Sequence, residues 1–207
     1  MARRSRRHAP PARTRRLSAW NLTLASVEYI ETVVGEVGTE DLARRIAGRL
    51  PPRITVALIG PLGSGKTRFV RALAESSGVP PRSVASPTFV LCRHYLGRVP
   101  IHHLDAYRVS DDDAWHELGV EEWTSSSGWT LIEWADRFAH FLVPPLLEIR
   151  IEILGADDRR RFTVRAHDRV SRGVVLGLAE RLRSQPESSA HRPTGNASSD
   201  ASPGSTS

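Results

Sequence analysis

Hydrophobic and polar residues follow strand-like and helix-like patterns in turn along the first part of the chain. The β-branched, alternating run at residues 26–34 predicts a strand, and the apolar run at 54–59 predicts a buried one. Between them, residues 38–50 predict a helix, because leucine and isoleucine recur there at helical spacing. Thr39 is its predicted N-cap. A second helix is predicted at 67–78, shortly after the buried strand.

The remainder of the chain predicts further strands and helices. Strands are predicted at 89–96, 99–108, 128–134, 146–154 and 159–166, and helices at 110–119, 135–142 and 170–184. Ser110 precedes three acidic residues and predicts the N-cap of the first of these helices. The last two predicted strands alternate strictly on either side of the segment GADD, which predicts an antiparallel hairpin.

A glycine-rich segment, GPLGSGKT, separates the predicted buried strand from the helix at 67–78. It fits G-x-x-x-x-G-K-[ST] between a strand and a helix, which is the context that a phosphate-binding loop requires. Backbone N–H groups and the helix N-terminus would hold a polyphosphate there. The residues of this phosphate loop are Gly60, Pro61, Leu62, Gly63, Ser64, Gly65, Lys66 and Thr67. The order of elements predicts an α/β fold: a three-layer sheet like that of phosphate-loop NTPases, with helices on both faces and a C-terminal antiparallel hairpin.

Lys66 is the only lysine among the 29 basic residues, and all the others are arginines. Lysine places a compact charge between terminal phosphates, whereas a guanidinium is a wide planar fork with a different reach. The alternative, a glycine-rich turn before an ordinary helix, gives no reason for a lysine here. We expect Lys66 to be an exposed loop residue that takes little part in core packing. We also expect it to have a catalytic role.

Two carboxylates end predicted strands. Asp105 ends PIHHLD and Glu133 ends WTLIE, so both are expected at the carboxyl edge of the sheet, where ligands bind in open α/β folds. Magnesium in such sites takes one or two carboxylates and the loop hydroxyl, here that of Thr67. The alternatives are a helix or turn cap for Asp105 and a surface ion pair for Glu133.

Other candidates carry weaker signals. Thr88, in the loop SPTF, is a candidate to approach the γ-phosphate, and Trp134 is a candidate to pack near the nucleotide or within the core. Arg108 is expected to bind phosphate or to pair with a nearby aspartate. His102 and His103 are adjacent in a predicted strand, so they point to opposite faces and cannot jointly bind one metal ion.

The net charge of +6 arises at the N-terminal end of the chain. Residues 1–16 hold seven arginines and no acidic residue, whereas 17–184 balance 21 basic against 21 acidic residues. We expect a disordered arginine-rich extension at 1–26, a phosphate-loop domain at 27–184 and a disordered serine- and proline-rich tail at 185–207. An arm that binds RNA is an alternative for the extension, as is a transit peptide, although helical apolar spacing is absent there.

Cysteine and hydropathy patterns bear on the compartment. A single cysteine, Cys92, cannot form an internal disulfide, which favours a reducing compartment. No apolar run reaches the ~18 residues of a transmembrane helix. We therefore expect a cytoplasmic protein without membrane partners.

The segments GPLGSGKT, SPTF, HHLDAYR and LIEW occur in this order. Together, over roughly residues 27–165, they resemble the TsaE family, the ATPase subunit of bacterial tRNA N6-threonylcarbamoyladenosine (t6A) synthesis. This resemblance implies a small ATPase with weak activity alone. It also implies that the chain binds the threonylcarbamoyl transferase heterodimer of TsaB- and TsaD-like subunits, which modifies adenosine 37 of ANN-decoding tRNAs. ATP hydrolysis would support repeated turnover of that complex, so contact with tRNA would be indirect.

The resemblance also implies roles for single residues. By motif, Thr67 and Glu133 would be the magnesium ligands, and Asp105 would be important for hydrolysis. The SPTF loop with Thr88 would act as a nucleotide-sensing switch. The cofactor would be Mg²⁺, with ATP as the substrate.

The resemblance also implies that the helix start near Glu36 and Thr39 would approach the base or ribose.

The phosphate loop departs from the family pattern at two positions. Family loops usually read GDLGAGKT, so Pro61 replaces an acid and Ser64 an alanine. Because the loop works through backbone N–H groups, these changes remove at most one phosphate contact, since proline lacks an N–H.

Two other classes of function remain open at this point. A small-molecule kinase uses the same loop but needs a mobile arginine-bearing lid. GADDRRRF, the segment that resembles such a lid, lies between alternating strands and is therefore predicted to be a hairpin tip. A non-enzymatic RNA-binding protein would use the arginine-rich extension but would leave the phosphate loop and both carboxylates unexplained.

Overall fold

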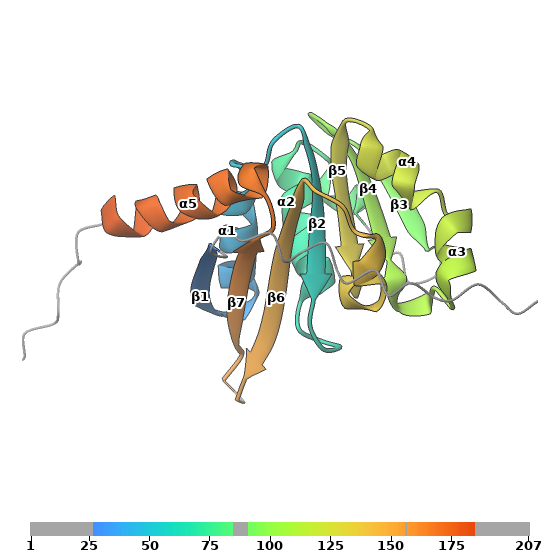
Figure 1. Cartoon of the computed structure of the whole chain (residues 1–207). Helices are drawn as coiled ribbons and strands as arrows, with labels where there is room; N and C mark the ends of the chain where they lie inside the picture. Colours follow the sequence, from blue (N-terminus) through green and yellow to red (C-terminus); the bar gives the residue numbers. More distant parts are fainter. Residues whose placement is uncertain (1–26, 85–90, 156, 185–207) are drawn as a thin grey trace, which may run out of the picture.

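The computed structural model describes residues 27–84, 91–155 and 157–184 (Figure 1). In chain order the elements are β1 (Glu28–Val34), α1 (Gly35–Ala47), β2 (Arg53–Ile59), α2 (Lys66–Ser76), η1 (Pro81–Ser83), β3 (Cys92–Leu96), β4 (Pro100–Asp105), η2 (Ala106–Arg108), α3 (Asp112–Glu117), α4 (Val120–Ser125), β5 (Gly128–Glu133), η3 (Ala135–Phe141), β6 (Leu146–Leu154), β7 (Arg159–Ala166) and α5 (Arg169–Ser184). The predicted extension at 1–26, the predicted tail at 185–207 and Thr88 lie outside the described residues.

The described strands form one mixed sheet in the order β1-β7-β6-β2-β5-β4-β3. Parallel pairs join β2 to β5, β2 to β6, and β4 to β5. Antiparallel pairs flank this centre, with β3 beside β4 on one side and β6, β7 and β1 on the other. The predicted C-terminal hairpin is confirmed, since β6 and β7 have the predicted bounds.

The central strands are buried on both faces, as expected where helices cover a parallel sheet on both sides. In β2, Val56 and Leu58 enter one hydrophobic cluster, whereas Ala57 and Ile59 enter a second. Residues of α1, α2 and α5 complete the first cluster, and residues of α3, α4 and η3 complete the second. Figure 1 shows α3 and α4 near β3–β5, and α5 at the opposite end of the sheet. The predicted three-layer α/β arrangement is confirmed.

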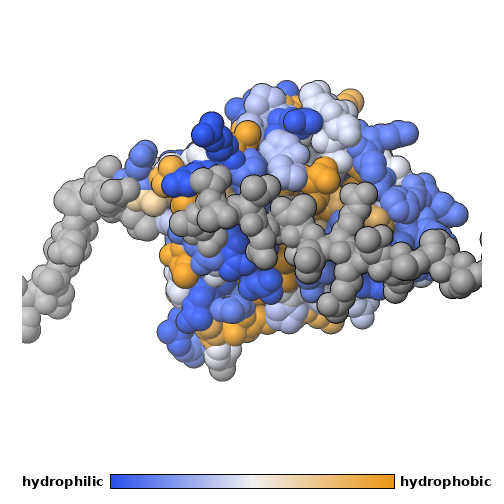
Figure 2. All heavy atoms as spheres, in the orientation of Figure 1, coloured by the Kyte–Doolittle hydropathy of each residue, from blue (hydrophilic) through white to orange (hydrophobic). Residues whose placement is uncertain are grey.

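Large hydrophobic side chains outside these clusters are dispersed. Those exposed to solvent are Ile30, Val34, Val37, Leu62, Leu96, Tyr107, Val143, Ile153, Val170 and Leu176. Figure 2 shows one face of the molecule, where hydrophilic residues predominate and hydrophobic ones form small groups. Among the described helices, none has the length and apolar content needed to cross a membrane.

Helix α1 begins earlier than its sequence pattern predicts. The helix starts at Gly35, so Thr39 lies inside it and is not its N-cap. The Thr39 hydroxyl donates instead to the carbonyl oxygen of Gly35 at 3.2 Å. The backbone N–H of Gly35 donates to the carbonyl oxygen of Asp158, at the hairpin tip, at 2.9 Å. A distant loop thus satisfies an amide that a helix start leaves without an intrahelical partner.

The N-cap of α3 is Asp111, not Ser110. The carboxylate of Asp111 accepts a hydrogen bond from the backbone N–H of Ala114 at 2.9 Å. The helix therefore begins later than predicted, with two acidic residues in its first turn. Both serine and aspartate suit an N-cap, so the sequence alone did not distinguish them.

Three other elements differ from prediction. Helix α4 was not predicted, since six residues are too few to show helical periodicity. The helix predicted at 135–142 is the 3₁₀ helix η3, in which Phe138 has non-helical backbone angles. The strand predicted at 99–108 ends at Asp105, and the next three residues form η2. Asp105 therefore marks the carboxyl end of β4.

Candidate active site

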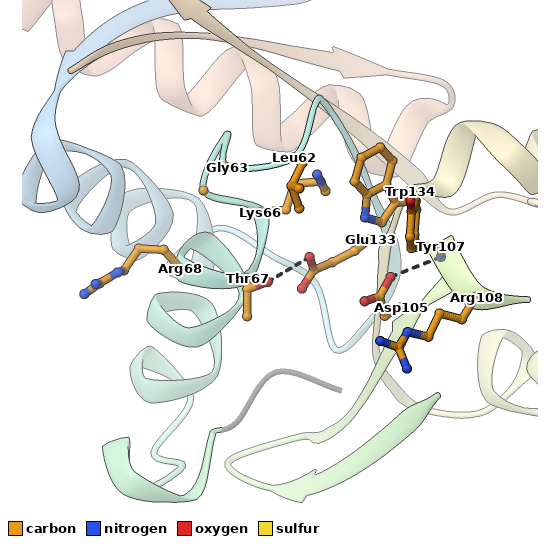
Figure 3. Close-up of a pocket in the computed structure, with 11 residues that line it drawn as sticks. Leu62, Gly63, Lys66, Thr67, Arg68, Asp105, Tyr107, Arg108, Glu133 and Trp134 are labelled. Atoms are coloured by element: carbon orange, nitrogen blue, oxygen red, sulfur yellow. Dashed lines mark hydrogen bonds between the residues drawn. The ribbon is translucent and has the colours of Figure 1, made fainter. Parts of the chain in front are cut away.

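The parallel strands β2, β5 and β4 direct their carboxyl ends to one edge of the sheet. In the paired register, Glu133 of β5 lies opposite Leu58 of β2 on one side and opposite Asp105 of β4 on the other. The phosphate loop follows β2 at the same edge. These elements enclose a cavity of about 450 Å³ (Figure 3). It is lined by Leu62, Gly63, Gly65, Lys66, Thr67, Arg68, Asp105, Tyr107, Arg108, Glu133 and Trp134.

Glycine is required at several positions of the phosphate loop. A side chain at Gly60 would place its Cβ 2.5 Å from the carbonyl oxygen of Ile151, in β6. Gly63 and Gly65 have φ angles of +78° and +101°, in the left-handed region that favours glycine. Helix α2 begins immediately afterwards, with Gly65 as its N-cap. The positive end of this helix therefore faces the cavity.

Lys66 is buried, with 5% of its surface exposed, so the expectation of an exposed lysine is wrong. Its ammonium donates to the carbonyl oxygens of Gly60 at 2.8 Å and of Pro61 at 2.9 Å. It also lies 3.7 Å from the ring centroid of Trp134, a cation–π contact. Burial lowers the pKa of Lys66, against the opposing effect of nearby carboxylates, of which Glu133 acts most strongly.

Thr67 and Glu133 are in direct contact. The Thr67 hydroxyl donates to Oε2 of Glu133 at 2.9 Å (Figure 3). The second carboxylate oxygen, Oε1, lies 2.8 Å from Nε2 of His103 in β4. Glu133 is only 3% exposed, so the alternative of a surface ion pair is wrong. No motif in the sequence marks His103 as a site residue, although the strand pattern predicts that His102 and His103 face opposite sides.

That prediction about the two histidines is confirmed. His102 packs in parallel on Trp123 with ring centroids 5.5 Å apart, and its Nδ1 lies 2.7 Å from Nδ1 of His94. His103 points to Glu133 on the opposite face. Only one of the two can therefore act in the candidate site.

Asp105 combines two of the expected roles. Its carboxylate accepts a hydrogen bond from the backbone N–H of Tyr107 at 3.1 Å and so caps η2, as the alternative interpretation predicted. It also lines the cavity beside Glu133. Burial raises the pKa of Asp105 and the Glu133 charge adds to this, while the bond from Tyr107 lowers it.

The oxygen atoms at this edge suit a hard divalent cation. Thr67 supplies a hydroxyl, and Glu133 and Asp105 supply carboxylates, the ligand types that Mg²⁺ prefers. The described part of the chain holds no cluster of three or more histidine, cysteine or acidic residues arranged to bind a metal ion. Mg²⁺ does not need one, because it keeps several waters and binds phosphate oxygens of the nucleotide.

Glu36 and Thr39 lie near the phosphate loop but do not line the cavity. Glu36 forms an ion pair with Arg68 at 2.5 Å, and Arg68 does line the cavity. The methyl group of Thr39 lies 4.0 Å from the Cβ position of Gly65. The start of α1 therefore adjoins the phosphate loop through these two contacts. Its approach to a base or ribose stays a prediction.

Arg160 of β7 reaches the phosphate loop, and sequence analysis did not assign it to the site. Its Nε donates to the carbonyl oxygen of Ser64 at 3.1 Å, while its Nη1 donates to the carbonyl oxygen of Asp158 at 3.0 Å and contacts the Asp158 carboxylate. Arg159 and Arg161, its neighbours, pair with Asp157 and Glu152 instead. Because side chains alternate along β7, Arg160 faces the opposite side from its two neighbours. Its contact with the phosphate loop depends on the packing of the hairpin against that loop.

Trp134 and Tyr107 form the aromatic wall of the cavity. Trp134 has a left-handed φ of 59°, directly after Glu133, and its ring centroid lies 4.9 Å from that of Tyr107. Arg108 lines the same cavity (Figure 3). Trp134 is therefore a wall residue of the site and a contact of Lys66.

The sequence model of the family described as "Threonylcarbamoyl adenosine biosynthesis protein TsaE" matches residues 34–162, more than half of the chain. The chain belongs to the TsaE family. The region that matches the TsaE model contains the phosphate loop, Asp105 and Glu133, and ends within β7.

Relatives named "tRNA threonylcarbamoyladenosine biosynthesis protein TsaE" share more than a third of their aligned residues with this chain. TsaE of Rickettsia conorii is 37% identical over 131 residues, which cover 63% of this chain and 74% of the relative. TsaE of Bacillus subtilis is 36% identical over 122 residues, which cover 58% and 75%. TsaE of Streptomyces coelicolor is 36% identical over 145 residues, which cover 68% and 91%.

A solved structure shares the TsaE fold seen here. The crystal structure of YdiB from Bacillus subtilis matches with a TM-score of 0.64 and 26% sequence identity. The match covers 77% of this chain and 99% of the YdiB chain. The TsaE fold therefore accounts for the mixed sheet, helices and hairpin described above.

Proposed function

We propose that this TsaE-family chain binds ATP with Mg²⁺ and hydrolyses it in support of t6A formation in tRNA. The relatives are named for this biosynthesis. The observation that carries the ATPase proposal is the contact between the Thr67 hydroxyl and the Glu133 carboxylate, next to the phosphate loop. Because tRNA modification is its context, we place the chain in the cytoplasm.

Binding of the phosphates rests on the loop and on α2. The loop N–H groups and the positive end of α2 would hold the β- and γ-phosphates. Lys66 would exchange its bonds to the carbonyls of Gly60 and Pro61 for bonds to phosphate oxygens. Thr67 and Glu133 would hold Mg²⁺, which, when bound, offsets negative charge on the phosphate oxygens.

Hydrolysis needs a group that orients the attacking water. We assign this role to Asp105, the second carboxylate at the same edge, because it lines the cavity and lies opposite Glu133 in the register. Its hydrogen bond from Tyr107 holds the carboxylate in place. The SPTF loop with Thr88, proposed as a nucleotide-sensing switch, lies outside the described residues.

Charge on the transferred phosphoryl group also needs stabilisation. Arg68, at the cavity, already pairs with Glu36 at 2.5 Å and with Glu40 at 3.0 Å. Arg137 donates to the carbonyl oxygen of Ala106 at 2.7 Å. Arg108 also lines the cavity. We therefore propose that the isolated chain is slow until the TsaB–TsaD-like heterodimer orders Arg108 or supplies another charged group. Such help is worth about 10³–10⁵ in rate in related phosphoryl-transfer systems.

Steady-state phosphate release tests the proposal. The cognate heterodimer is titrated against a fixed amount of this chain with ATP and Mg²⁺. Stimulation is expected to saturate at a defined stoichiometry and to vanish with Asp105→Ala. A fast isolated enzyme that ignores the heterodimer but responds to a small hydroxyl compound would instead support the small-molecule kinase.

A further inference from the structure

We infer that His103 is a positioning residue of the active site: its Nε2 holds the Glu133 carboxylate in the orientation in which the other carboxylate oxygen meets Thr67. This inference rests on the proposed magnesium site. It concerns a residue that is not among those lining the cavity and that acts through Glu133.

The Glu133 carboxylate is held from both sides. Oε1 lies 2.8 Å from Nε2 of His103, and Oε2 accepts from the Thr67 hydroxyl at 2.9 Å. His103 has no exposed surface, and Glu133 is almost fully buried. With one partner for each oxygen, rotation of the carboxylate about its last bond would break both contacts. Thr67 and His103 therefore define the plane of the carboxylate.

Only one nitrogen of His103 takes part. Among the described residues, Nδ1 of His103 is buried without a hydrogen-bond partner. A carboxylate oxygen accepts hydrogen bonds, so Nε2 must carry the proton that faces Glu133. The hydrogen bond that His103 forms in the described structure therefore goes to the carboxylate of Glu133.

The hydrogen bond of His103 is directed at the site, because it runs from β4 to the last residue of β5. Both side chains are buried, so this bond satisfies buried polar atoms and fixes the carboxylate of the proposed metal ligand. Groups that orient metal ligands in this way commonly change metal affinity about 10- to 100-fold when removed.

Because only Nε2 of His103 is hydrogen-bonded, amide substitutions can separate the donor at Nε2 from the Nδ1 position. In His103→Gln, the amide nitrogen takes the place of Nε2, so the donor to Glu133 is kept and nothing is required at the Nδ1 position. In His103→Asn, the shorter amide reaches only the Nδ1 position, and the donor is lost. His103→Leu removes both nitrogens. His102→Gln, in the same strand but facing the opposite side, is the matched control.

The experiment measures metal binding directly, without turnover. Mn²⁺, as a probe for the Mg²⁺ site, is titrated into each full-length variant saturated with a non-hydrolysable ATP analogue, and bound Mn²⁺ is followed by electron paramagnetic resonance. We expect His103→Asn and His103→Leu to bind Mn²⁺ about 10- to 100-fold more weakly than wild type. His103→Gln and the control are expected to stay within about threefold, well below that range. Affinity for the analogue without a divalent cation should be unchanged in all four.

Two outcomes would overturn the inference. One is wild-type Mn²⁺ affinity in both His103→Asn and His103→Leu. The other is a His103→Gln variant that folds, by its thermal unfolding, yet binds Mn²⁺ as weakly as His103→Asn. If His103→Leu does not fold, the Mn²⁺ affinities of His103→Gln and His103→Asn still test the inference. Absence of cation-dependent nucleotide binding in the wild type would overturn the proposed function itself, which is a distinguishable result.

Discussion

The hydroxyl of Thr67 donates a hydrogen bond to Oε2 of Glu133 at 2.9 Å, although the two residues are 66 positions apart in the chain. The contact joins the start of α2 to the end of β5 at the edge where the phosphate loop emerges. It brings together the hydroxyl and the carboxylate that the proposed function assigns to Mg²⁺. Substitutions around this contact should therefore separate effects on metal binding from effects on nucleotide binding.

Glu133→Gln is expected to weaken the magnesium dependence more than the affinity for ATP itself. An amide is a poorer ligand for a hard cation than a carboxylate. It also has one oxygen, whereas Thr67 and His103 each contact a separate oxygen of Glu133. Magnesium is titrated at fixed ATP, with nucleotide binding as the readout. Glu148→Gln, at a partly buried glutamate of β6 that pairs with Arg165, is the control, and coincident curves for Glu133→Gln and wild type would contradict the assignment.

Lys66→Ala is expected to reduce phosphate release about 10²–10³-fold, as for the loss of one charged contact in a transition state. The fold should survive, because the ammonium hydrogen-bonds to carbonyls of its own loop, those of Gly60 and Pro61, and otherwise makes one cation–π contact, with Trp134. Lys66→Arg should fail as well, since the planar guanidinium has a different reach. Circular dichroism checks the fold, and phosphate release at wild-type rate in either variant would refute the role.

Arg160→Gln is expected to weaken nucleotide binding about tenfold, the lower end of what one charged hydrogen bond contributes. Its guanidinium fixes the carbonyl of Ser64 from β7, and glutamine is too short to keep that bond. Arg161→Gln is the matched control, because its exposed ion pair with Glu152 contributes little. Calorimetric titration with ADP compares the two variants. Equal ADP affinities of Arg160→Gln and Arg161→Gln would show that Arg160 does not contribute to nucleotide binding.

Cys92 is expected to react slowly with thiol reagents in the folded chain. Burial raises its pKa from 9.0 to about 11. At pH 8 the reactive thiolate should therefore be about 100-fold scarcer than in the unfolded chain. Reaction with a chromogenic disulfide, with and without denaturant, measures this ratio. Similar rates in both conditions would contradict the burial of the thiol.

The same shift predicts how Cys92 affects stability against pH. A raised pKa means that the folded state holds the proton more tightly, so the stabilising contribution is complete below the unfolded value of 9.0. It is lost as the pH rises from 9.0 towards about 11. Cys92→Ser should flatten this part of the stability curve in chemical denaturation between pH 8 and pH 10, since the hydroxyl does not ionise there. An unchanged slope would argue against the shift.

Local patterns in the sequence determined most elements of this fold. The bounds of β6 and β7 follow from strict alternation, because successive side chains of a strand face opposite sides. The phosphate loop follows from glycines at positions that tolerate no side chain or need left-handed angles. The placement of Asp105 and Glu133 at one edge follows from parallel strands that end in acidic residues. Each of these inferences needs only spacing within one segment and the general geometry of sheets.

Contacts between distant segments were decided only by the tertiary structure. The hairpin tip supplies the carbonyl of Asp158 that lets α1 begin at Gly35, and β7 sends Arg160 to a loop 96 residues away. His103 acquires its role only because β4 and β5 are neighbours in the sheet. Lys66 is buried because Trp134, from the end of β5, packs against it. Periodicity within a segment carries no information about which distant segment supplies a partner, since that choice depends on strand order and on packing between layers.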